Sequence, residues 1–179
     1  MDKEKSVFKC AAENGISFGI YLSVIFFTCI YGTSSFLINS IGLIMILAAP
    51  LMLFRYMRKF YKTHPDTSPI VTLWNLGIFT SLFGSLICAL VTYIWLQYIT
   101  PTFIIDQAKA ALAVYEQYPD LSDNNLVISL RKAIEENLLP TPIVVVLQLI
   151  WFTTSLGVVG SLIMAPLAKI KKVDSNNNI

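Results

Sequence analysis

Residues 70–99 read IVTLWNLGIFTSLFGSLICALVTYIWLQYI, an apolar run without a single charged side chain. Because an α-helix rises about 1.5 Å per residue, a run of this length exceeds the roughly 30 Å hydrocarbon core of a bilayer. Lipid offers the backbone no hydrogen-bond partner, so such a run can cross only as a helix that closes its own hydrogen bonds. The segment therefore predicts a transmembrane helix.

Three further apolar runs of crossing length flank this one along the chain. They cover residues 11–31, 36–57 and 143–167. The composition agrees, since 55% of the 179 residues are apolar and 13% are charged, whereas about 25% are charged in soluble domains. The sequence predicts an all-α integral membrane protein, in which a four-transmembrane-helix bundle forms a single membrane domain over residues 1–179.

Lysine and arginine collect on one side of these four spans. Ten of the thirteen basic residues fall in the N-terminal tail, the loop after the second span or the C-terminal tail. They are Lys3, Lys5, Lys9, Arg55, Arg58, Lys59, Lys62, Lys169, Lys171 and Lys172. The segment between the third and fourth spans carries three basic and six acidic residues. By the positive-inside rule, both termini are predicted to be cytoplasmic and this segment extracytoplasmic.

The extracytoplasmic segment, residues 101–138, shows helical periodicity on both sides of a break at Tyr118-Pro119-Asp120. The apolar positions are Phe103, Ile104, Ala108, Ala111, Leu112 and Tyr115, and then Leu126, Leu130, Ala133, Ile134 and Leu138. This pattern predicts an amphipathic helical hairpin, with Ser122 as the cap of its second helix. We expect the hairpin to rest on the outer leaflet or on the bundle. A lid over a ligand is the alternative.

Small side chains recur every four residues in three of the spans. The third span contains Gly77, Ser81, Ser85 and Ala89, the fourth contains Thr153, Gly157, Ser161 and Ala165, and the first contains Gly15 and Gly19. Small residues let helix backbones approach closely, which is how helices associate in lipid. We expect the third and fourth spans to pack together inside one bundle, with a homodimer seam as the alternative.

Polar side chains inside the spans are few, and no Asp, Glu, Lys, Arg or His lies in the middle of any span. Ion pathways and proton relays generally use ionisable groups, so ion-coupled transport is not favoured. The candidates for a polar groove are Asn75, Gln148 and Thr154, together with Ser81 and Ser85. Hydrogen bonds between helices are the simpler role for these side chains.

Four basic residues near the end of the second span, Arg55, Arg58, Lys59 and Lys62, follow i, i+3, i+4 and i+7 spacing. A continuing helix would align them as one stripe, and contact with anionic phospholipid headgroups accounts for it. Nucleic acid is not an expected partner, because the patch is small and no aromatic residues interleave with it. Membrane lipids, and either a membrane-protein partner or a second copy, are the expected partners.

The residue inventory offers no catalytic, cofactor-binding or metal-binding group. The one histidine, His64, lies in a loop, and the cysteines Cys10, Cys29 and Cys88 lack the spacing of a zinc site. No Ser, Cys or Lys has an evident base in the sequence. We therefore expect a non-enzymatic protein without a cofactor.

The order of segments resembles that of a known bacterial family. The third span ends in YIWLQYITPTF, residues 93–103, and the last span follows LPTP, residues 139–142. This layout is similar to the bacterial domain-of-unknown-function family four-one-nine-nine, although the inner loop, residues 62–69, lacks the glycine expected there. The resemblance implies a multi-pass protein of the bacterial cytoplasmic membrane and brings no site residues. A non-enzymatic accessory or scaffold protein is expected, with a small lipid or solute carrier as the alternative.

Overall fold

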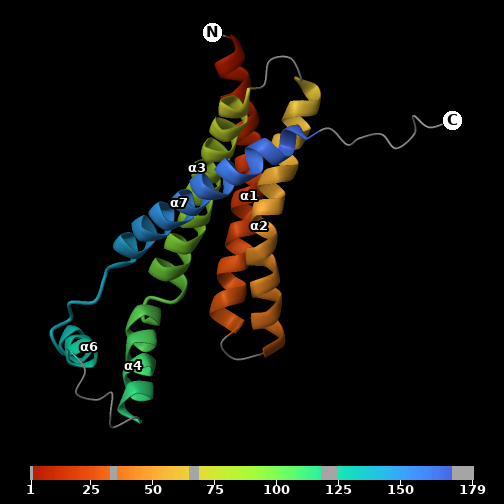
Figure 1. Cartoon of the computed structure of the whole chain (residues 1–179). Helices are drawn as coiled ribbons and strands as arrows, with labels where there is room; N and C mark the ends of the chain where they lie inside the picture. The colour runs from red at the N-terminus through yellow and green to blue at the C-terminus, as the bar shows by residue number, and fades with distance from the viewer. Residues whose placement is uncertain (1, 33–35, 65–68, 118–124, 171–179) are drawn as a thin grey trace. The chain divides into compact units, whose positions relative to one another are not determined.

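The computed structural model describes residues 2–32, 36–64, 69–117 and 125–170, and these residues form helices and turns without a strand. The elements in chain order are α1 (Asp2–Gly32), α2 (Phe36–Thr63), α3 (Ile70–Ile94), the π-helical turn η2 (Trp95–Ile99), α4 (Phe103–Glu116), α6 (Asn125–Glu135) and α7 (Pro142–Lys169) (Figure 1). The all-α prediction is confirmed.

Four helical segments are long and apolar enough to cross a membrane. They are Val7–Gly32, Phe36–Thr63, Ile70–Ile99 and Pro142–Lys169. Each contains one of the four predicted runs, and three of them extend beyond it. The second helix continues past Met57 to Thr63, because arginine and lysine are good helix formers once the chain leaves the apolar run. Four apolar helices of this length indicate a multi-pass membrane protein.

Proline constrains the backbone at the start of α7 and within α2. α7 begins at Pro142, and the backbone N–H groups of Val144 and Val145 donate to the Thr141 carbonyl at 3.0 and 3.2 Å. Proline is well suited to the first helical position because its missing N–H would have no partner there. Pro50 lies inside α2, where it removes one backbone hydrogen bond from the helix.

The described chain forms two compact units. The first consists of Met1–Cys88 and Leu149–Ile179, and the second of Ala89–Gln148. Within the first unit, α1 and α2 lie side by side (Figure 1). The hydroxyl of Tyr21 donates a hydrogen bond of 2.6 Å to the Met45 carbonyl and so links these two helices.

The hydrophobic core of the first unit lies mainly where α1 and α3 begin and where α2 and α7 end. Its buried side chains are Val7, Ala11, Phe18, Leu53, Met57, Phe60, Leu73, Leu76, Ala165 and Ala168. Four helices contribute to this one core, so they form a bundle. The cationic residues of α2 and α7 belong to these same helix ends.

The second unit contains η2, α4 and α6. Trp95 packs edge-on against Phe103, with ring centroids 4.8 Å apart. The Arg131 guanidinium is 2.8 Å from the Glu116 carboxylate and joins α4 to α6, while Lys132 and Glu136 form an i,i+4 pair at 3.8 Å. The predicted cap Ser122 and the break at residues 118–120 lie outside the described residues, as do Lys171 and Lys172.

The buried face of α6 differs from the expected one at its first turn. Leu126 was expected to face inward, yet it is 76% exposed, while Val127 is 2% exposed. Successive residues of a helix are about 100° apart. Val127 lies three residues before Leu130 and seven before Ile134, and these two side chains are half-buried. The face through Val127 is therefore the one that packs.

Candidate functional site

One stripe of small residues on α3 contacts α7. A Cβ atom added to Gly77 would overlap the side chains of Ser161 and Met57, and one added to Gly157 would overlap the side chain of Ser81. Ser81 and Ser161 are 1% and 0% exposed. The two helix backbones approach so closely here that a glycine on each helix faces a serine on the other.

Polar groups join the same two helices at intervals along this contact. The hydroxyls of Ser85 and Thr154 are 3.1 Å apart, and the indole N–H of Trp74 donates to the Val158 carbonyl at 3.3 Å. Ser85 also donates to the Leu82 carbonyl of its own helix at 2.8 Å. Hydrogen bonds of this kind add to van der Waals packing between helices in lipid.

A second stripe on α3 meets α1 in the same way. A Cβ at Gly15 would lie 2.5 Å from the Phe83 Cβ, and one at Gly19 would lie 2.7 Å from the Ile87 Cβ and 2.8 Å from the Gly84 carbonyl. Gly84 is not among the packing residues predicted from the sequence. The signal was present, because Thr80, Gly84 and Cys88 are small residues at four-residue spacing, and all three are buried.

The family model described as "Protein of unknown function (DUF4199)" matches residues 13–169. The chain belongs to this family. The match runs from within α1 to the last residue of α7, so DUF4199 covers all four apolar helices. No curated protein and no solved structure matches the chain.

The candidate polar-groove residues of this DUF4199 chain do not form one cluster. Asn75 is exposed, whereas Ser85 is buried and contacts the half-buried Thr154. Asn75 and Ser85 lie about 15 Å apart along the axis of α3, given the rise of a helix. Gln148 is exposed and belongs to the second unit.

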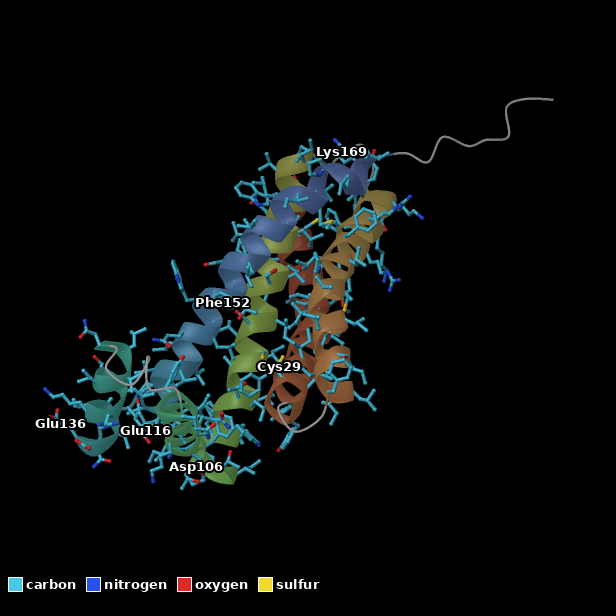
Figure 2. All side chains as sticks on the ribbon, turned by 60° about the horizontal axis from the view of Figure 1, so that its bottom comes forward. Cys29, Asp106, Glu116, Glu136, Phe152 and Lys169 are labelled. Carbon is cyan, nitrogen blue, oxygen red and sulfur yellow. The ribbon has the colours of Figure 1, made fainter. Side chains whose placement is uncertain are left out.

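The four basic residues of α2 are not equivalent. Arg55, Lys59 and Lys62 are exposed, whereas Arg58 is half-buried and its guanidinium carbon lies 5.6 Å from the centre of the Phe54 ring. From α7, the Lys169 ammonium lies 5.9 Å from the centre of the Tyr61 ring; Lys169 is labelled in Figure 2. Cations over aromatic faces are attracted by the ring quadrupole.

A groove of about 360 Å³ lies between α2 and the end of α7. Its lining residues are Leu51, Phe54, Arg58, Met164, Leu167 and Ile170. Five of these six side chains are apolar, and Arg58 is the charged one. The groove is therefore mainly apolar, with one cation among its lining residues.

The described part of the chain contains no candidate metal-binding site. Those residues include no group of three or more His, Cys, Asp or Glu side chains placed to hold a metal ion. Cys10 is half-buried, Cys29 is exposed and Cys88 is buried, and none of the three forms a disulfide bond. The Asn14 amide donates to the Cys10 sulfur at 3.3 Å.

Proposed function

We propose that this chain is a non-enzymatic accessory or scaffold protein of the bacterial cytoplasmic membrane. The observation that carries the proposal is the packing of α3, which meets α7 and α1 along two stripes that leave no room for a Cβ at the contacting glycines. A helix held closely on two faces makes a stiff centre for a bundle. Such a centre suits a protein that presents its outer helices to other molecules.

The outer surfaces of α2 and α7 support this role. In the most apolar stretch of each, 11% of residues are buried, against 39% for α1 and 44% for the span of α3. Trp151 of α7 is 77% exposed and Phe152 is 63% exposed; Phe152 is labelled in Figure 2. Lipid or the helices of a membrane-protein partner, including a second copy, would cover these apolar faces.

The charge pattern supports the proposed orientation. Ten of the thirteen basic residues belong to the two tails and the loop after α2. We therefore place both termini in the cytoplasm and the α4–α6 segment outside it.

A small lipid or solute carrier with a polar groove has less support. The hydroxyls of Ser85 and Thr154 bond one another, and Ser81 is 1% exposed between the helices. These groups are used in the contact between α3 and α7, so they offer little to a passing solute. A carrier would need this contact to open.

One experiment with two arms tests the proposal. A photoreactive phenylalanine analogue at Trp151, which is exposed on α7, should crosslink to a distinct protein in native membranes. The same analogue at Leu76, which is 0% exposed, should crosslink only within the chain. Crosslinks to lipid alone from Trp151, and from other exposed positions of α2 and α7, would contradict a scaffold.

The second arm asks whether water reaches the α3–α7 contact. In a variant without native cysteines, Ser85→Cys should resist a polar thiol reagent in opened membranes, whereas the exposed control Thr63→Cys should react. Similar reaction rates at the two positions would favour the carrier over the scaffold.

A further inference from the structure

The groove between α2 and α7 combines an apolar wall with one half-buried cation. Leu51 and Phe54 form the α2 side, Met164 and Leu167 form the α7 side, and Arg58 lies one turn beyond Phe54. Arg58 lines the groove, and its guanidinium carbon lies 5.6 Å from the centre of the Phe54 ring. The charge therefore borders an apolar surface instead of projecting away from it.

A second cation, Lys169, belongs to the same end of α7 but is not among the residues that line the groove. Lys169 lies in sequence between the lining residues Leu167 and Ile170, and its ammonium is near the Tyr61 ring of α2. Among the described residues, the ion pairs are Arg131 with Glu116 and Lys132 with Glu136, both in the second unit. Within this part of the chain, neither Arg58 nor Lys169 pairs with a carboxylate.

The groove also lies at the depth where a lipid changes from chain to headgroup. Residues 36–54 of α2 and 142–168 of α7 carry no charge, and the charged residues begin at Arg55 and Lys169. The apolar lining residues precede this boundary on α2, and Arg58 follows it. A phospholipid has the same order along the membrane normal, with its acyl chains in the apolar interior and its phosphate nearer the water.

We propose that this groove binds one anionic phospholipid, with an acyl chain against Leu51, Phe54, Met164 and Leu167 and the phosphate on Arg58. A guanidinium can donate two parallel hydrogen bonds to a phosphate, which suits Arg58 to the primary contact. Arg55, Lys59 and Lys62 are exposed and do not line the groove, so they add general attraction to an anionic surface. This site goes beyond the scaffold role and does not depend on it.

The binding test uses the purified full chain in mild detergent and native mass spectrometry. Phosphatidylglycerol and phosphatidylcholine with identical acyl chains are added separately. We expect one phosphatidylglycerol molecule to remain bound, with clearly weaker retention of phosphatidylcholine. Arg58→Gln should lower the bound fraction about fivefold, the effect of one cation near a lipid headgroup. The matched control Arg55→Gln removes the same charge outside the groove and should change it less than twofold.

A second pair of variants tests the acyl-chain part of the site. Leu51→Trp should fill the groove and displace the lipid, whereas Leu47→Trp, one turn away and also exposed on α2, should not. Both positions are more than half exposed, so both variants should unfold at the wild-type temperature in detergent.

Four results would overturn the proposal. If Arg58→Gln and Arg55→Gln lowered the bound fraction of phosphatidylglycerol equally, the lipid would be held by general attraction between charges. If Leu51→Trp and Leu47→Trp lowered the bound fraction equally, the groove would not bind the acyl chain. Displacement of phosphatidylglycerol by an equal concentration of soluble glycerol phosphate would mean a phosphate site without a lipid chain. An acidic peptide that displaced the lipid while inorganic salt did not would point to a protein partner instead.

Discussion

At the scale of single residues, two glycines of α7 have the same chemistry but different surroundings. A Cβ at Gly157 would overlap the Ser81 side chain, whereas a Cβ at Gly160 would find nothing within 4 Å. Spacing in the sequence separates them in part, because Gly157 shares a four-residue period with Ser161 and Gly160 does not. The contact itself depends on a residue of a different helix.

Gly157→Ala should therefore destabilise the bundle, while Gly160→Ala should not. Overpacking a close contact costs about 1–3 kcal/mol, and alanine is favoured over glycine in a helix by about 1 kcal/mol. Thermal unfolding in detergent measures both effects. Because the contact with Ser81 lies within one chain, the particle mass should stay unchanged in both variants. Equal stability of the two variants, or a halved mass for Gly157→Ala, would contradict an intramolecular role.

At the scale of elements, α3 is the helix on which the first unit depends. Its stripe at Gly77, Ser81 and Ser85 meets α7, and its stripe at Thr80 and Gly84 meets α1. The two stripes lie on neighbouring faces because their positions differ by one residue, or about 100°. The length of its apolar run identifies α3 as a helix in the sequence. Only its small residues indicate which two faces contact other helices.

The α4–α6 pair gives a second test at this scale. Val127 is the buried side chain of α6, so Val127→Asp should place an unpaired charge in an apolar contact and separate the two helices. Leu126→Asp changes the neighbouring, 76% exposed position and serves as the control. Limited proteolysis should cleave the α4–α6 segment several-fold faster in Val127→Asp alone. Equal cleavage rates would show that α6 packs through another face.

The ion pair in this segment adds little to its stability. The side chains of Arg131 and Glu116 are 50% and 46% exposed, so solvent weakens their attraction despite the 2.8 Å distance. Exposed pairs typically contribute below about 1 kcal/mol. We therefore expect the burial of Val127 to contribute more to the stability of this segment than the ion pair.

At the scale of the whole molecule, the distribution of charge predicts sidedness. In a variant without native cysteines, Glu136→Cys should react with an impermeant thiol reagent in intact spheroplasts, whereas Lys62→Cys should react only after the membrane is opened. Both side chains are exposed, so both should react once the reagent reaches them. The opposite pattern would mean that the orientation is inverted. Labelling of both positions in intact spheroplasts would place both outside and contradict the single crossing by α3 between them.

Several features of the fold follow from the sequence because they depend on local chemistry. An uncharged apolar run of crossing length must be helical in lipid, whatever surrounds it, so the all-α class and the four apolar helices could be predicted without a structure. The extension of α2 to Thr63 and the inward face at Val127 could not, because hydropathy says little about where a helix stops or which neighbour it meets.

The sequence by itself determined four long apolar helices, the small-residue stripes and the excess of cations on one side, since each is a matter of residue type and spacing. Only the tertiary structure decided that Gly157 meets Ser81, that Gly84 lies against α1, and that Arg58 alone of four basic residues of α2 lines a groove with α7. The physical reason is the same in each case. These contacts join residues far apart in the chain, and the spacing within one helix does not specify which helix covers each of its faces.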